Sequence, residues 1–134
     1  MLIHWIRLLI LPLVLLLAAC AIESSKPETV VAKRAQARWD ALIKGDLETA
    51  YQFLSPGYRQ AMPFDRYERN IHGVGLWQAA RVSKVVCKQP DVCEATVEVD
   101  VKLVVPRIQE PIESTNPLYE RWVYTDKQWW YVPE

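Results

Sequence analysis

The strictest pattern in this chain is an alternation of apolar and polar residues over the segment 93–105. Alanine, valine or leucine occupies the odd positions from 95 to 103, and charged residues or threonine occupy the even positions from 94 to 102. A period of two places one face of a β-strand in a core and leaves the other in water, as an antiparallel sheet allows. The segment therefore predicts a half-buried strand whose apolar face other elements must cover.

Apolar residues with helical spacing lie in the first half of the chain and could cover that face. They are Val31, Ala35, Trp39, Leu42 and Ile43. This stripe predicts a helix from Pro27, with Ser25 and Glu28 as a capping box at its start. Gly45 can end that helix in the left-handed conformation, and Asp46 can cap the next one.

The remaining elements follow from the same two periods. We expect a second helix over 47–54, a turn after Ser55-Pro56 and a third helix over 64–71. Strands are expected over 77–86, 119–125 and 128–132, with 106–117 as a long proline-bearing connection. Helices that precede antiparallel strands indicate an α+β domain with the N-terminal helices packed on one face of the sheet.

The last two strands would carry an aromatic cluster. If Asp126 and Lys127 form a two-residue turn, Tyr124 lies opposite Trp129 and Trp122 lies opposite Tyr131. The four rings then share one face, which is either plain core beneath the helices or the wall of a pocket. Trp130 falls on the other face, where an exposed tryptophan would indicate an interface.

The N-terminal segment predicts where in the cell the protein is located, independently of its fold. An apolar run over 8–19 follows Arg7, is interrupted by Pro12 and ends in Leu17-Ala18-Ala19-Cys20. It is too short to cross a bilayer, which takes roughly 20 residues, and its small residues suit a signal-peptidase site. The ending resembles the lipobox of bacterial lipoproteins; the alternatives are an uncleaved anchor and a plain secretory signal that is cut elsewhere.

That resemblance implies a signal peptide over 1–19, lipidation of Cys20, a short tether over 20–26 and a single domain over 27–134. The membrane would then be a partner through the lipid anchor. Proteobacterial lipoproteins kept in the inner membrane carry an aspartate after the cysteine, and this chain has Ala21 there. The expected location is therefore the outer membrane, facing the periplasm.

Cys87 and Cys93 remain in the exported part, where disulfides persist. They flank a short loop between two predicted strands, and we expect a disulfide worth roughly 2–2.5 kcal/mol by loop-closure entropy. A metal site would need more ligands than these two thiols and His72 offer, and no cofactor motif is visible.

The charge balance argues against nucleic acid as a partner. The chain has 16 basic and 16 acidic residues, so loss of Arg7 with the leader leaves 15 against 16. No basic run or patch stands out, whereas nucleic-acid binding requires a clustered positive footprint.

Two segments resemble nuclear transport factor two-like domains. One is the Gly45-Asp46 step between two helices, followed by Leu54-Ser55-Pro56-Gly57-Tyr58; the other is the closing pair Glu120–Tyr124 and Trp129–Val132. The resemblance covers roughly residues 27–132. Within this fold, the chain is most similar to uncharacterised bacterial lipoproteins. It implies helices under a curved, cone-shaped antiparallel sheet. Members of that fold include isomerases, dehydratases and non-catalytic binding or dimerising domains, so the fold does not decide the function.

We therefore expect a non-catalytic binding or interaction domain. Its partner would be a second copy, an envelope protein or a small hydrophobic ligand. The residues expected at a pocket are Tyr58, Tyr67, His72, Trp77, Trp122, Tyr124, Trp129 and Tyr131.

The alternative is a small cone-fold enzyme with acid–base chemistry on a hydrophobic molecule. Its base would be Asp65 or His72, helped by tyrosine hydroxyls. The sequence places no two titratable groups together in one cavity, so the catalytic alternative stays second.

Overall fold

The computed structural model describes residues 25–134; the predicted leader, Cys20 and most of the predicted tether lie outside the described residues. Four helices precede four strands. The elements are α1 (Pro27–Lys44), α2 (Leu47–Tyr51), α3 (Pro56–Ala61), α4 (Phe64–Asn70), β1 (Trp77–Gln89), β2 (Val92–Leu103), β3 (Ile112–Thr125) and β4 (Gln128–Val132).

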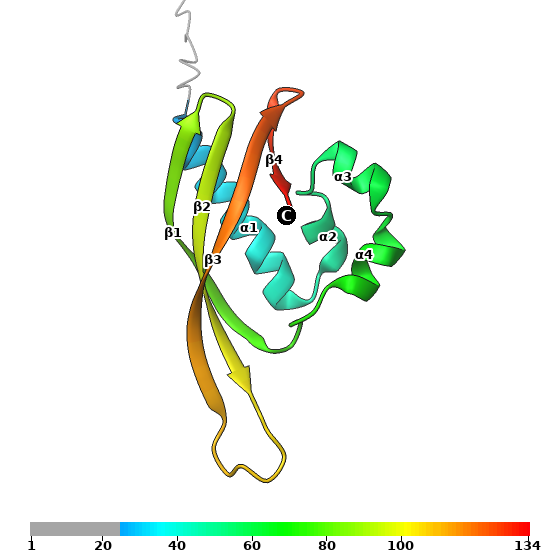
Figure 1. The fold of residues 1–134 in the computed structure, drawn as a ribbon, viewed down its shortest axis with the longest axis vertical. Coiled ribbons are helices and arrows are strands. Elements are labelled where there is room, and N and C mark those ends of the chain that lie inside the picture. The colour runs from blue at the N-terminus through cyan, green and yellow to red at the C-terminus, as the bar shows by residue number, and fades with distance from the viewer. Residues whose placement is uncertain (1–24) are drawn as a thin grey trace, which may run out of the picture.

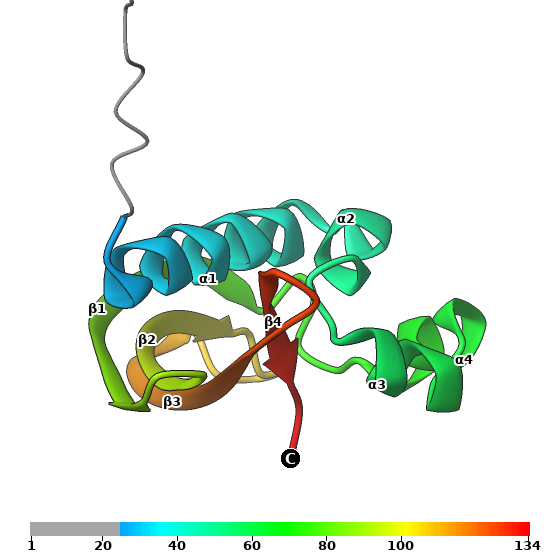
Figure 2. The same cartoon turned by 90° about the horizontal axis from the view of Figure 1, so that it is seen from above.

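The strands pair in chain order as an antiparallel meander, β1-β2-β3-β4, and the sheet is not closed. Figures 1 and 2 show α1 lying along the sheet, with α2, α3 and α4 grouped beyond β4. The predicted α+β class, with N-terminal helices packed on an antiparallel sheet, is confirmed. Among residues 25–134, no helix has the length and apolar character needed to cross a membrane.

Helix α1 ends as the sequence predicts but begins differently. Gly45 adopts the left-handed conformation, with φ of 73°, and its N–H donates to the carbonyl of Leu42. At the other end Lys26 is the N-cap residue and no side chain caps the helix, so the predicted Ser25–Glu28 capping box is not formed. Asp46 accepts from the backbone N–H of Thr49 and caps α2, as expected.

The predicted second helix is shorter than expected, and a further one follows it. Helix α2 stops at Tyr51 instead of continuing to Leu54, because residues 53–55 pair with the edge strand β4. Tyr131 N–H donates to the Phe53 carbonyl, and Ser55 N–H donates to the Tyr131 carbonyl. Ser55 then caps α3 by accepting from the N–H of Tyr58.

The prediction of a connection over 106–117 is wrong for its second half, which belongs to a strand. Strand β3 begins at Ile112, and its residues up to Glu120 pair with β2 along one edge only. Pro117 lacks an N–H and is tolerated in a strand only where one edge has no partner strand. Proline was therefore a misleading signal for a loop in this segment.

The closing hairpin has the predicted register. Trp122 lies opposite Tyr131, and Tyr124 lies opposite Trp129. Asp126 and Lys127 both have positive φ, 51° and 61°. This backbone fits the two-residue turns whose twist matches that of the strands.

The core lies between α1 and the sheet, with a smaller cluster under α2, α3 and α4. Two groups of fully buried side chains pack against α1. The group at its start includes Val31, Ala35 and Trp122. The group at its end includes Leu42, Val97 and Val99. The smaller cluster is built from Tyr51, Leu54 and Tyr67, with Tyr131 packed against it. The aromatic face of the closing hairpin is thus largely core.

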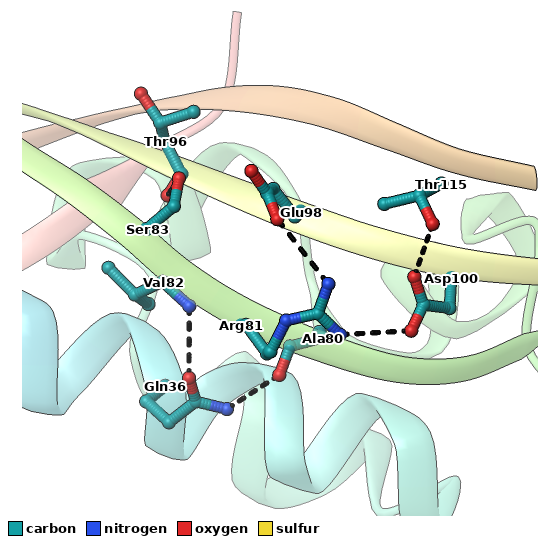
Figure 3. A network of polar contacts seen from close by, with 9 residues as sticks. All are labelled: Gln36, Ala80, Arg81, Val82, Ser83, Thr96, Glu98, Asp100 and Thr115. Carbon is teal, nitrogen blue, oxygen red and sulfur yellow. Dashed lines mark hydrogen bonds and ion pairs between the residues drawn. The ribbon is translucent and has the colours of Figure 1, made fainter.

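A glutamine fixes α1 to the outer edge of the sheet. Gln36 Nε2 donates to the Ala80 carbonyl at 2.9 Å, and Gln36 Oε1 accepts from the Val82 N–H at 3.1 Å (Figure 3). These bonds satisfy β1 edge groups that no further strand pairs, which also protects this edge from association. On the other side of the same strand, Arg81 pairs with Glu98 and Asp100 in water (Figure 3).

The predicted disulfide is present. Cys87 and Cys93 are bonded to each other and lie opposite one another in the β1–β2 register. The bond therefore joins two strands that already pair. Its expected stabilisation is still roughly 2 kcal/mol, because it constrains mainly the unfolded chain.

Candidate functional site

The centre of the molecule holds a buried ion pair. Arg38 of α1 donates from Nη1 to Glu120 Oε1 of β3 at 2.5 Å. Both side chains are almost fully removed from solvent, with exposed fractions of 7% and 3%. Removal of one partner from such a pair leaves an uncompensated buried charge, which costs about 3–5 kcal/mol.

Glu120 is also held by two tryptophans. Trp39 Nε1 donates to Oε1 at 2.7 Å, and Trp122 Nε1 donates to Oε2 at 3.1 Å. The carboxylate thus accepts hydrogen bonds from α1 on Oε1 and from β3 on Oε2. We call these four residues, Glu120, Arg38, Trp39 and Trp122, the Glu120 network. Its contacts give Glu120 a structural role.

Sequence reasoning missed Glu120 and Arg38 as site residues. A signal was present, because strand alternation puts Glu120 on the same face as Trp122, which we expected to point inward. A carboxylate on an apolar face needs buried donors. Arg38 lies one position before Trp39 on the helix and could have been named as its partner.

A cavity of about 190 Å³ lies beside this network. Its walls come from α1, α3, α4 and the end of β4. The lining residues are Arg38, Tyr58, Met62, Tyr67, Asn70, Ile71, Tyr131 and Pro133. This volume corresponds to about six water molecules at liquid density, so the cavity suits a compact guest.

Two of the residues that line the cavity each carry a buried polar atom with no hydrogen-bond partner among the described residues. The atoms are Tyr67 Oη and Arg38 Nε, and both residues are more than nine-tenths buried. The Arg38 guanidinium also lies 4.0 Å from the centroid of the Tyr131 ring. Buried polar groups are normally paired, so these two atoms are unusual in lacking a partner.

Burial governs the ionisation of two tyrosines in this wall. It raises the pKa of Tyr67 and of Tyr131, while the positive charge of Arg38 works in the opposite direction on both. Arg38 also lowers the Tyr67 pKa through a side-chain interaction, although the pair does not reach full hydrogen-bond geometry. Both hydroxyls are therefore protonated near neutral pH and can donate.

The structure brings three of the predicted pocket residues together at this cavity: Tyr58, Tyr67 and Tyr131. Two others, Tyr124 and Trp129, line a separate hollow of about 530 Å³ at the start of α1. A further hollow of about 580 Å³ lies over β2 and β3. Its charged residues Asp100 and Lys102 already pair with Arg81 and Glu113.

Two predicted pocket residues belong to the core. Trp122 is fully buried in the network described above. Trp77 packs edge-on against Trp39, with ring centroids 5.2 Å apart. Its ring also covers Gly73, where an added Cβ would lie 2.6 Å from the indole.

The two candidate bases lie on the surface. Asp65 has a side-chain exposed fraction of 70% and pairs with Arg69 one helical turn away. His72 is exposed in the segment that joins α4 to β1. Neither is among the residues that line the cavity.

Trp130 lies on the opposite face of its strand from Trp129 and Tyr131, but it is half-buried instead of exposed. The guanidinium groups of Arg34 and Arg59 lie 5.6 and 5.5 Å from its ring centroid. Its Nε1 donates to the Thr125 carbonyl. The proposed interface residue is therefore partly covered by the chain itself.

Comparison with known proteins adds no assignment: no protein-family model matches this chain, and no curated protein is significantly similar to it.

Tyr67 and Tyr51 provide a matched test of the unpartnered hydroxyl. Their rings are 5.2 Å apart, and Tyr51 Oη donates toward the carbonyls of Met62 and Arg59. We expect Tyr51→Phe to lower the free energy of unfolding by about 1 kcal/mol, and Tyr67→Phe to leave it unchanged or raise it. Urea unfolding of both variants measures this, and an equal loss in both would show that Tyr67 Oη is satisfied.

Proposed function

We propose that this protein is a lipid-anchored envelope protein whose domain binds a small ligand without catalysing a reaction. The observation that carries the ligand part is the pair of buried, unpartnered donors, Tyr67 Oη and Arg38 Nε, on two residues that line one cavity. The lipobox-like ending at Cys20 carries the anchor.

The anchor would hold the domain close to the membrane. Six residues separate Cys20 from Pro27, and they span at most about 20 Å when fully extended. Two acyl chains already give stable attachment, so the linkage implied by the lipobox would be permanent. The Ala21 position favours the outer membrane and a periplasmic location.

The chemistry of the cavity favours a compact guest with an apolar body and an oxygen acceptor. Met62, Ile71 and Pro133 supply apolar wall, while Tyr67 and Arg38 supply donors. Arg38 is already neutralised by Glu120. A second carboxylate beside that pair would add an uncompensated negative charge, so we propose a neutral ligand.

A non-catalytic role is favoured because the cavity lacks a base. Asp65 and His72, the only candidates that the sequence suggested, lie at the surface. Glu120 accepts hydrogen bonds on both oxygens from three donors, so it is poorly placed to take a proton from a guest.

We also propose that the domain is of the nuclear transport factor two-like type. The capped Gly45-Asp46 step and the closing aromatic hairpin support this assignment. In that arrangement the cavity between the helices and β4 would be the opening of the cone.

Lipidation is tested by metabolic labelling of the full chain with radioactive palmitate in a bacterial host. We expect label in the wild-type chain and in Cys87→Ser, and none in Cys20→Ser, because only Cys20 would be acylated. The Cys20→Ser chain should also migrate as the unprocessed precursor. Label that persists in Cys20→Ser would contradict the proposed anchor.

Ligand binding is tested by native mass spectrometry of the full chain released from dodecylmaltoside micelles. We expect an additional small-molecule mass that disappears on denaturation, with occupancy reduced at least several-fold in Tyr67→Phe and retained in Tyr51→Phe. A spectrum showing the same single mass before and after denaturation would contradict the ligand part of the proposal.

A further inference from the structure

A second polar cluster lies outside the cavity, around Trp130. Among residues 25–134, only three arginines are not exposed: Arg34, Arg38 and Arg59. Arg38 forms an ion pair with the carboxylate of Glu120. In the same part of the chain, Arg34 and Arg59 form no ion pair, although both are half-buried.

Arg34 is fixed in place by protein contacts that leave its charge unmatched. Its Nε donates to the Trp129 carbonyl at 2.8 Å, and its guanidinium lies 5.0 Å from the Phe53 ring centroid. Burial lowers the pKa of Arg34. By contrast, Asp100 and Glu98 raise the pKa of Arg81, which is exposed and paired.

Arg59 approaches the same indole from α3. Its Nη1 donates to Gln52 Oε1 at 2.8 Å, and its Nε is buried without a partner in the described chain. The Ser55 N–H bond to β4 and the Arg59 N–H bond to the Ser55 carbonyl hold this turn against the sheet. The two guanidinium groups are therefore positioned before any guest arrives.

We infer that Arg34, Arg59 and Trp130 form a binding site for a phosphate group. A cation–π contact contributes about 0.5–2 kcal/mol, but it does not neutralise a second cation on the same ring. Guanidinium groups match phosphate oxygens with paired N–H donors. The site takes one residue from each of α1, α3 and β4. None of the three lines the cavity beside the Glu120 network.

The test is isothermal titration calorimetry of the full chain in dodecylmaltoside micelles, in Tris-chloride at constant ionic strength. The probes are sodium phosphate and dihexanoylphosphatidylglycerol. We expect saturable one-to-one binding that weakens at least tenfold in Arg34→Gln and in Arg59→Gln. Arg81→Gln, which removes an arginine already paired with carboxylates, should bind as the wild type does.

The two probes separate the sources of phosphate. Tighter binding of the phospholipid indicates a membrane headgroup, and equal or tighter binding of inorganic phosphate indicates a soluble phosphate ligand; either result supports the site. Absence of saturable heat with both probes overturns it, as does binding that both glutamine variants retain. If Arg59→Gln fails to fold, Arg34→Gln and Arg34→Lys decide. The lysine keeps the charge but loses the paired donors, so it should bind more weakly than wild type and more tightly than Arg34→Gln.

Discussion

The buried carboxylate of Glu120 is the interaction on which the rest of this structure depends. It joins α1 to β3 through Arg38 and Trp39, and it orders Trp122 on its own strand. While the carboxylate holds Arg38 Nη1, the same guanidinium lies over the Tyr131 ring, and its Nε is buried without a partner among the described residues. Packing and the candidate ligand site therefore share one polar centre.

Local signals predicted most of the fold. The helical stripe of α1, the glycine that ends it and the Asp46 cap are decided by neighbours in the sequence. The register of the closing hairpin follows from its two-residue turn, and the disulfide follows from the spacing of two cysteines in a chain predicted to be exported. Local signals failed at Pro117, because an edge with no partner strand tolerates proline and the sequence does not show which edge is open.

The candidate site was only half predictable. Three of the tyrosines expected at a pocket line one cavity, and the reason for expecting them was that such rings have apolar bodies and polar tips. The pairing of Arg38 with Glu120 spans 82 positions, and the two arginines at Trp130 come from two different helices. Such contacts depend on how α1 and α3 cross the sheet, which no local pattern specifies. Under the two proposals, the domain would bind a phosphate at Trp130 and a small neutral molecule in the separate cavity.

The most direct test of this account is a double-mutant cycle on the central pair, with Arg38→Met, Glu120→Leu and the double variant in urea unfolding. The account predicts that each single variant loses about 3 kcal/mol or more, whereas the double variant loses much less than their sum, because neither charge is left alone in the core. Losses that add to within about 0.5 kcal/mol would contradict it, since the two side chains would then act independently.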